Sequence, residues 1–330
     1  MATQPLADSL APPRSLASRL PSIAALGPFL ALALACGFFA SQTDRFLSGQ
    51  NFSLILQQVM VVGVIAIGQT LIILTAGIDL SCGMIMALGS IVMTKLAVDS
   101  GLNPYLAIAL GVLTCAAFGF LNGALITFIK LPPFIVTLGT LNIAFAITQI
   151  YSQSQTVTGL PEVLTFLGNT FRVGQTSVTY GTVTMLVMYL LTWFILRDTA
   201  AGRHVYALGN NPEATRLMGI PTRRLLISVY TIAGVLYGVA ALMIVARTGV
   251  GDAMAGQTDN LDSITAVVLG GTSLFGGRGM ILGTLIGALI VGVFRNGLTL
   301  MGVPSVYQIL ITGILVILAV TTDQMSRAKE

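Results

Sequence analysis

The sequence predicts an all-α protein that crosses a membrane about ten times, and its composition is the first reason. Only 8% of the 330 residues are charged, against about 25% in an ordinary soluble domain. Hydrophobic residues make up 55% of the chain, and the mean hydropathy is +0.90. Because these residues cannot cover a water-soluble surface, the composition excludes secreted disulfide scaffolds, nucleic-acid binders and cytosolic enzymes.

The spacing of the charges is the second reason. A charged side chain costs about 2.5 to 3.5 kcal/mol or more at the centre of a membrane helix, so charges mark the ends of spans. Ten uncharged gaps follow one another, and the third, eighth and ninth hold only 15 or 16 residues, rich in glycine. Such segments favour helices broken within the membrane, with eight or nine spans as the alternative. The gaps run Arg19–Asp44, Arg45–Asp79, Asp79–Lys95, Asp99–Lys130, Lys130–Glu162, Arg172–Arg197, Arg224–Arg247, Asp262–Arg278, Arg278–Arg295 and Arg295–Asp323.

Ten spans of about 20 residues leave roughly 130 residues for termini and loops, so no second large domain is expected. The expected organisation is a cytoplasmic tail over 1–20, one membrane domain over 21–323 and a cytoplasmic tail over 324–330. Arg14 and Arg19 precede an apolar stretch at 23–40 that imitates a signal peptide. Since the rest of the chain is equally hydrophobic, we expect an uncleaved first span.

The distribution of basic residues predicts the orientation. With the N-terminus inside, eleven Lys and Arg residues fall inside and five outside, which favours both termini in the cytoplasm. We therefore interpret the net charge of +4 as a sign of topology. The inside residues are Arg14, Arg19, Lys130, Arg197, Arg203, Arg216, Arg223, Arg224, Arg278, Arg327 and Lys329, and the outside residues are Arg45, Lys95, Arg172, Arg247 and Arg295.

Two connections are long enough to fold on their own. The segment 151–177 falls outside and is rich in Thr, Ser and Gln. It either caps a pathway and meets an external partner, or is a plain solvated loop. The segment 197–224 falls inside and carries five of the eleven inside positive charges.

Within 197–224, the sequence predicts a short helix at 211–219. Asn211 suits the N-cap, Pro212 the first helical position, and Glu213 the positive end of the helix dipole. Gly219 then suits the stop. A two-turn helix is too short to be stable alone in water, so it docks on its own membrane domain or on a cytoplasmic partner.

Asp79 is the most conspicuous charge in a hydrophobic region, within Gly77-Ile78-Asp79-Leu80-Ser81-Cys82-Gly83. In one interpretation an unwound segment turns Asp79 and Ser81 toward a polar cavity, or Asp79 holds the broken backbone. In the other, the segment is a cytoplasmic turn that caps the next helix. Because no other acid lies near the expected midplane, coupling to an ion gradient is disfavoured.

Uncharged polar and small residues within the spans leave two further questions open. Amides could recognise a hydroxylated solute, or tie helices together. Glycines four apart permit close helix contact, either inside one subunit or at a dimer seam. The amides are Asn122, Asn142, Gln149, Asn296 and Gln308, and the glycines are Gly119/Gly123, Gly234/Gly238 and Gly279/Gly283/Gly287.

The sequence contains no recognisable motif for a disulfide framework, a metal site, ATP binding or hydrolytic catalysis. The cysteines Cys36, Cys82 and Cys115 have no CxxC spacing and there is one histidine, so neither a disulfide framework nor a metal site is expected. No lysine follows a glycine in a GxxxxGK[ST] phosphate loop, and neither GxSxG nor HExxH occurs. If ATP energises this protein, another chain must bind it.

Four motifs then carry a resemblance to a known family. They are GQTLIILTAGIDLSCG at 68–83, LPPFIVTLGT at 131–140, GRHVYALGNNPEATRLMGI at 202–220 and LDSITAVVLGGTSLFGGRGMILGTLIGALIVGVFRNGL at 261–298. Over roughly 45–323 the chain resembles the permease subunits of bacterial ABC monosaccharide importers of the ribose type, and the motifs look closest to the fructose branch. It departs from the family pattern at Cys82, where Val is usual, and at 257–260, where Gln-Thr-Asp-Asn replaces Gly-Tyr-Glu-type residues.

The resemblance implies a fold of the ribose- and cobalamin-importer type and a set of partners. These are a second permease copy, a cytoplasmic ATPase that uses ATP-Mg, and a periplasmic sugar-binding protein, in a bacterial inner membrane. The chain itself would bind no cofactor, and an ion-coupled secondary transporter is the alternative. The expected ATPase-coupling residues are Gly202, Arg203, Tyr206, Gly209, Asn210, Glu213, Ala214, Arg216 and Gly219, with Gly209 and Gly219 ending short elements. The gating or pathway candidates are Asp79, Ser81, Asn122, Asn142 and Asn296.

Overall fold

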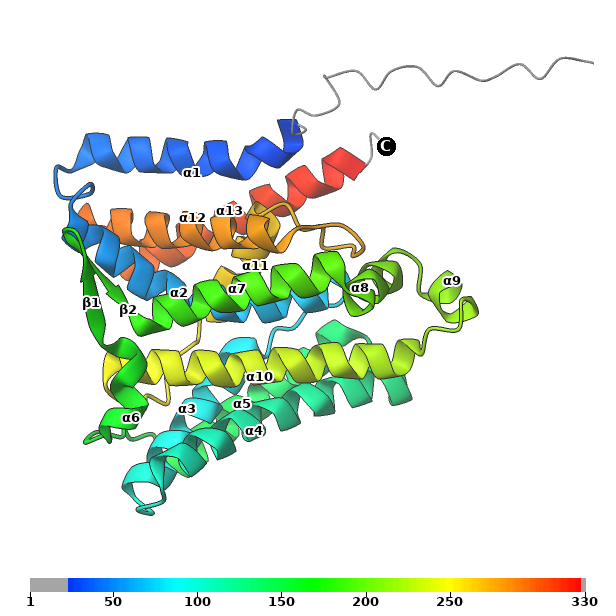
Figure 1. Cartoon of the computed structure of the whole chain (residues 1–330), viewed down its shortest axis with the longest axis horizontal. Coiled ribbons are helices and arrows are strands. Elements are labelled where there is room, and N and C mark those ends of the chain that lie inside the picture. Colours follow the sequence, from blue (N-terminus) through cyan, green and yellow to red (C-terminus); the bar gives the residue numbers. More distant parts are fainter. Residues whose placement is uncertain (1–22, 328–330) are drawn as a thin grey trace, which may run out of the picture.

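The computed structural model describes residues 23–327 and confirms the predicted all-α membrane fold (Figure 1). A helix lies over each of the ten predicted gaps. These helices are α1 (Ile23–Gln42), α2 (Gly49–Leu74), α3 (Cys82–Val98), α4 (Pro104–Ala124), α5 (Pro133–Ser152), α7 (Tyr180–Asp198), α10 (Thr222–Thr248), α11 (Asp259–Leu269), α12 (Ile281–Leu300) and α13 (Ser305–Arg327). A π-helix at Leu125–Ile129 extends α4. The predicted tail over 1–20 and the last three residues of the tail over 324–330 lie outside the described residues.

The described helices differ in whether they can span a membrane. Six are long and apolar enough by length and composition, namely α2, α4 with its π-helix, α5, α7, α10 and α12. Gly27–Gln42, Cys82–Val98 and Ser305–Leu318 are shorter apolar helices. The eleven residues of α11 reach about 16 Å, roughly half of a bilayer core of about 30 Å. The eighth predicted span is therefore a half-helix, as its short gap suggested, whereas α12 is full length because it continues past Arg295.

The core of the bundle is formed by α2 and α10. The spanning windows of these two helices are 78% and 67% buried within the chain, against 28% for α5 and α7. Large apolar side chains on α1, α4, α5, α7 and α13 are exposed, as expected for a surface that faces lipid or another apolar partner. The shorter helices α3 and α11 are also mostly buried, so the outward surface belongs to the other helices.

Close helix contacts within the chain use the small residues that the sequence singled out. A Cβ on Gly119 of α4 would collide with the Tyr230 carbonyl on α10, and one on Gly234 would lie 2.5 Å from the Cys115 carbonyl. Gly283 and Gly287 likewise approach α11. These glycines therefore serve packing inside one subunit. Gly279 precedes α12 with φ 154°, so it does not belong to the same helix face.

The connection 151–177 is folded and lies at one end of the bundle. It contains α6 (Glu162–Thr165), a 3₁₀ turn (Phe166–Gly168) and the antiparallel pair β1 (Thr170–Val173) and β2 (Thr176–Thr179). At the opposite end lie α8 (Ala200–Asn210) and α9 (Pro212–Leu217), on the same side as the start of α1 and the end of α13 (Figure 1). The two long connections thus lie at opposite ends, as the predicted threading requires, and the side that faces the cytoplasm stays a prediction.

Leu160→Cys and Asn210→Cys variants test this arrangement in a membrane. We expect a membrane-impermeant thiol reagent to label them from opposite sides, because the two positions lie at opposite ends of the bundle. The parent protein is the control for the native thiols, of which Cys82 and Cys115 are buried and Cys36 is half-buried. Labelling of both variants from one side would contradict the threading.

Candidate functional site

The segment between α7 and α10 is built by two capped helices. Thr199 begins α8, and its hydroxyl accepts a hydrogen bond from the Gly202 amide at 3.3 Å. Asn211 then begins α9, and its side chain accepts from the Ala214 amide at 2.9 Å. Gly219 takes a φ of +82° just after α9, a conformation that favours glycine. The short helix predicted at this place is confirmed.

The helix α8 packs against the membrane domain. Gly202 and Gly209 are buried, and a Cβ on Gly209 would collide with the Leu74 carbonyl at the end of α2 and lie 2.6 Å from the Gly277 amide. The Tyr206 hydroxyl donates to the Gly279 carbonyl at 3.0 Å, and burial raises the pKa of the Tyr206 phenol. Gly209 lies one residue before the end of α8, where the sequence places the end of a short element, and it allows α8 to approach α2 and the loop 270–280 closely.

The helix α9 instead presents an exposed surface, which we call the α9 tip. It combines charged and small polar groups with two large apolar side chains, Leu217 and Met218, which are 77% and 66% exposed. The sequence analysis missed these two, although large apolar residues in an otherwise polar helix are a recognisable sign of a contact surface. The exposed residues among the predicted coupling set are Arg203, Asn210, Glu213, Ala214, Arg216 and Gly219.

The predicted gating residue Asp79 is buried in the connection between α2 and α3. Its Oδ1 accepts from the Ser81 amide at 2.8 Å and from the Ser81 hydroxyl, and its Oδ2 accepts from the Tyr237 hydroxyl of α10 at 3.2 Å. The Gln69 side chain donates to the Asp79 carbonyl. These bonds fit the interpretation in which Asp79 holds a broken backbone, and not that of a solvated cytoplasmic turn.

Two neighbouring helices complete this cluster around Asp79. Asn122 of α4 donates to the Ser81 hydroxyl at 3.0 Å, and Thr137 of α5 donates to the Ile78 carbonyl at 3.2 Å. The break between α2 and α3 is thus tied to α4, α5 and α10. Asn296, another pathway candidate, is buried on α12, and its Oδ1 finds no hydrogen-bond partner among the described residues.

A second break follows α10, where residues 249–258 turn back into the bundle before α11 begins. Gln149 of α5 donates to the Ala253 carbonyl at 3.0 Å, and Val157 exchanges two backbone hydrogen bonds with Gly251. Gly256 has a φ of +76° and lies against Gly83 at the start of α3, so closely that neither could carry a Cβ. Contacts from three sides therefore position this segment, which we call the re-entrant segment.

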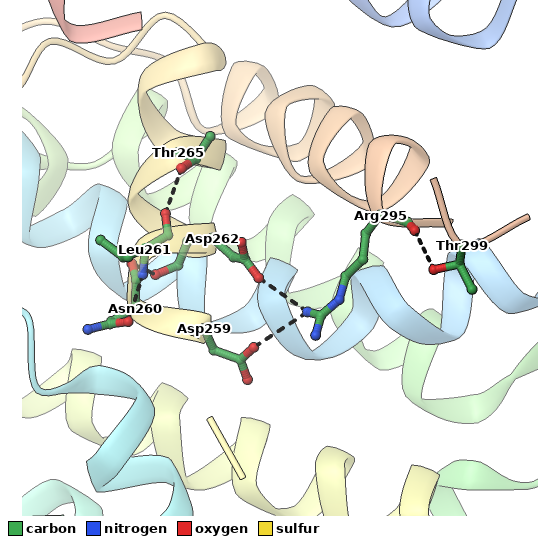
Figure 2. Close-up of polar contacts among 8 residues, drawn as sticks. Asp259, Asn260, Leu261, Asp262, Thr265, Arg295 and Thr299 are labelled. Carbon is green, nitrogen blue, oxygen red and sulfur yellow. Dashed lines mark hydrogen bonds and ion pairs between the residues drawn. The ribbon is translucent and has the colours of Figure 1, made fainter. Parts of the chain in front are cut away.

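The first turn of α11 carries two buried carboxylates that meet a cation from α12. Figure 2 shows Arg295 extended toward both, with its Nη1 at 3.2 Å from Asp262 Oδ2 and 4.0 Å from Asp259 Oδ1. Because α11 is a half-helix, these acids begin it at about half the depth of a membrane. The expectation that Asp79 is the only acid in such a position is wrong.

Two cavities of about 260 Å³ each lie along the re-entrant segment. They share Gly256 and Gln257, and Asn142 of α5 faces the second of them. Of the pathway candidates only Asn142 lines either cavity. The first is lined by Ser90, Ile244, Arg247, Thr248, Val250, Asp252, Met254, Ala255, Gly256, Gln257, Thr258, Asp259 and Arg295. The second is lined by Met84, Leu141, Asn142, Phe145, Gly256, Gln257 and Asn260.

Sequence reasoning missed most of these cavity residues. Arg295 and the neighbouring Asp262 served only as limits of predicted spans, and Asp259 was named only within the departure at 257–260, because their pairing across 33 or more positions is invisible along the chain. A usable signal was the departure from the family pattern at 257–260, which spans the end of the re-entrant segment and the start of α11. Within the described residues, no group of three or more His, Cys, Asp or Glu side chains is placed to hold a metal ion.

A multi-span bundle with polar cavities between its helices and a protruding contact surface at one end is typical of a membrane transport protein. Comparison with known proteins agrees. The family model for the permease component of the branched-chain amino acid transport system matches residues 51–320. The chain is 46% identical to the fructose import permease protein FrcC of Rhizobium meliloti over 86% of its own length and 80% of the relative's.

Two ribose import permeases are similar over more of their length. The chain is 41% identical to RbsC of Bacillus subtilis (92% of this chain and 94% of the relative) and 38% identical to RbsC of Escherichia coli K12 (89% and 92%). The chain therefore belongs to this family of transport-system permease components.

Removal of the Asp79 carboxylate tests its bracing role. Asp79→Ala leaves the Ser81 amide and the Tyr237 hydroxyl without their buried acceptor, at a cost of about 1–3 kcal/mol each. We expect a lower melting temperature in detergent and impaired transport, with a smaller effect for Asp79→Asn, which keeps an acceptor oxygen. The control is Asp198→Asn at the exposed end of α7. An Asp79→Ala protein that melts and transports like its parent would contradict the role.

The ion pairs of Arg295 should behave as one unit. Arg295→Leu leaves the buried carboxylates of Asp259 and Asp262 without their cation. Because hydrogen bonds to charged groups contribute about 1.5–3 kcal/mol, the melting temperature should fall. Arg295→Leu combined with Asp262→Leu should recover part of the loss, because removal of both partners avoids an unpaired buried charge. Strictly additive effects in this double-mutant cycle would show that the pair is not coupled.

Proposed function

We propose that this chain is the membrane-spanning permease subunit of an ATP-driven sugar importer in a bacterial inner membrane. The observation that supports it most is the division of the segment 200–219. The helix α8 is anchored on the membrane domain, while α9 projects its charged and apolar tip away from it. A transporter that powers itself does not need such a surface, whereas one that is driven by a separate ATPase does.

The α9 tip would seat in the cytoplasmic ATPase subunit. Arg216 of α9 and the exposed Arg203 of α8 can make charge-assisted hydrogen bonds to it, and Leu217 and Met218 can fill an apolar pocket. Movement of α9 would then reach α8 and, through Gly209, the end of α2 and the loop 270–280, where the Gly277 amide donates to the Leu74 carbonyl at 3.0 Å. That loop joins α11 to α12, which carry Asp259 and Arg295 of the first cavity. A movement of the loop would therefore reach the cavity region. ATP and Mg²⁺ would be bound by the partner only.

The opposite end would receive the sugar-binding protein from the periplasm. All four residues of β1 are exposed there, and α6 projects beside the hairpin (Figure 1). This assignment places both termini in the cytoplasm, on the side of α8 and α9. It favours the interpretation in which 151–177 meets an external partner.

A second permease copy would complete the assembly. Asn142, halfway along α5, and Gln257 are both exposed on a single chain. Amides at membrane depth are costly against lipid and are found facing protein or a water-filled cavity. The face of α5 and the re-entrant segment would therefore line a pathway toward the second copy. The relatives are named for fructose and ribose import, so a monosaccharide is the proposed cargo.

Uptake of radiolabelled fructose and ribose into proteoliposomes tests the proposed function. The permease alone is compared with the permease plus its candidate ATPase, ATP and binding protein. Uptake only in the complete system would support the importer. Uptake by this chain alone under an imposed ion gradient would overturn it in favour of a secondary carrier, for which the buried Asp259 and Asp262 would be candidate ion ligands.

Variants that separate α9 from α8 test the coupling role. Glu213→Lys reverses an exposed charge, so it should uncouple ATP hydrolysis from uptake while the melting temperature stays unchanged. Gly209→Val places a side chain against the Leu74 carbonyl, so it should lower the melting temperature of the permease itself. Asp44→Lys, a charge reversal near the other end of the bundle, is the control. Parental uptake by Glu213→Lys in the complete system would count against coupling through α9.

A further inference from the structure

The geometry points to a sugar-contact site on the re-entrant segment, where the side chains of Gln257 and Asn142 hydrogen-bond the hydroxyls of a neutral monosaccharide as it crosses. This inference rests on the proposed function and deepens it, because it assigns the position at which the permease itself touches its cargo. The site comprises the two cavities that meet at Gly256 and Gln257.

The free hydrogen-bonding capacity of the two amides is the first argument. Gln257 Nε2 makes only a long contact of 3.5 Å to Met254 Sδ, and Asn142 Nδ2 donates to the Leu138 carbonyl at 2.9 Å. Neither Gln257 Oε1 nor Asn142 Oδ1 accepts a hydrogen bond from any described residue. Each amide therefore has a free acceptor oxygen beside the cavity. A sugar hydroxyl can donate a hydrogen bond to this oxygen and accept another from the amide nitrogen.

The balance of charges in the cavity wall is the second argument. Arg247 and Arg295 line the first cavity together with Asp252 and Asp259, so two formal positive charges face two negative ones. A charged solute would meet a like charge on this wall and would lose its hydration without a dedicated partner. A neutral molecule with many hydroxyls meets alternating donors and acceptors and has no such cost.

The other lining residues suit the same class of ligand. Phe145 and Leu141 of α5 and Met84 of α3 contribute apolar surface beside the amides in the second cavity. A monosaccharide has hydroxyl edges and a face of C–H groups, so it needs both kinds of contact. A lipid tail needs only apolar surface and would leave the amides and ions unpaired.

The depth of the site is the third argument. Asn142 is the tenth of twenty residues in α5, and Asp259 begins a half-helix that runs to one end of the bundle. The second cavity thus lies near the middle of the membrane domain, away from the α9 tip, and the first continues from it toward the hairpin end, where Arg247 and Thr248 close α10. A solute that crosses the protein must pass this level, and the break in the helices provides the space.

Uptake kinetics of Gln257→Leu and Asn142→Leu test the site in the complete transporter. The loss of one neutral hydrogen bond, about 0.5–1.5 kcal/mol, corresponds to an uptake about 2- to 12-fold lower for each variant, with a changed ratio of fructose to ribose uptake. Stimulation of ATP hydrolysis by the binding protein should stay within about twofold of the parent. The matched control is Gln42→Leu, which removes an exposed amide at the end of α1, outside the connection 151–177. Uptake and sugar ratio equal to those of Gln42→Leu would overturn the inference.

Thiol labelling gives a second readout that does not depend on the leucine variants folding. A hydrophilic thiol reagent should react with Gln257→Cys and Asn142→Cys in membranes and block uptake, because the cavities hold water. Val183→Cys, on an exposed apolar position of α7, should react far less. Lack of reaction at both cavity positions would overturn the site.

The two proposals fail in different ways. If the parent protein shows no ATP-dependent sugar uptake, the proposed function is wrong. If the parent transports and both leucine variants transport with the parental sugar ratio, only the sugar-contact site is wrong. A fall in uptake together with an equal fall in stimulated ATP hydrolysis would assign the two amides to structure and overturn sugar contact.

Discussion

The need to satisfy backbone groups where helices break inside the membrane shapes this protein more than any other constraint. Lipid supplies no hydrogen bonds, so an interrupted helix survives only where protein or trapped water provides them. The chain is interrupted twice, between α2 and α3 and between α10 and α11. Asp79, Ser81 and Asn122 supply partners at the first break, and Gln149 and Val157 do so at the second.

The two breaks also meet each other. Asn260 at the start of α11 donates to the Leu80 carbonyl at 3.3 Å, and Gly83 lies against Gly256. The Asp79 cluster and the re-entrant segment therefore form one continuous polar region through an otherwise apolar bundle. Since each side of the contact braces the other, the Asp79 cluster positions the cavities without lining them.

The pattern of charges and caps predicts the helices but not their pairing across the breaks. A charge in lipid is so costly that the gaps between charges located ten helices, and cap chemistry at Asn211 and Gly219 located α9. The same reasoning treated Asp262 and Arg295 as boundaries, because it assumes that every charge lies outside the membrane. That assumption fails where an acid and a base from α11 and α12 neutralise each other, which only the folded structure can show.

The ions between α11 and α12 need an explanation beyond stability. Asp259 and Asp262 are buried, but the Arg295 side chain is 48% exposed, and partly exposed ion pairs contribute little to stability, so these pairs are not required to hold α11 against α12. Asp259 and Arg295 instead keep one wall of the first cavity polar, where apolar side chains would exclude water. A wall with balanced charges admits water and neutral hydroxylated solutes and gives no deep binding site for an ion. The placement of these ions thus suits a passage for sugars better than an ion-coupled carrier.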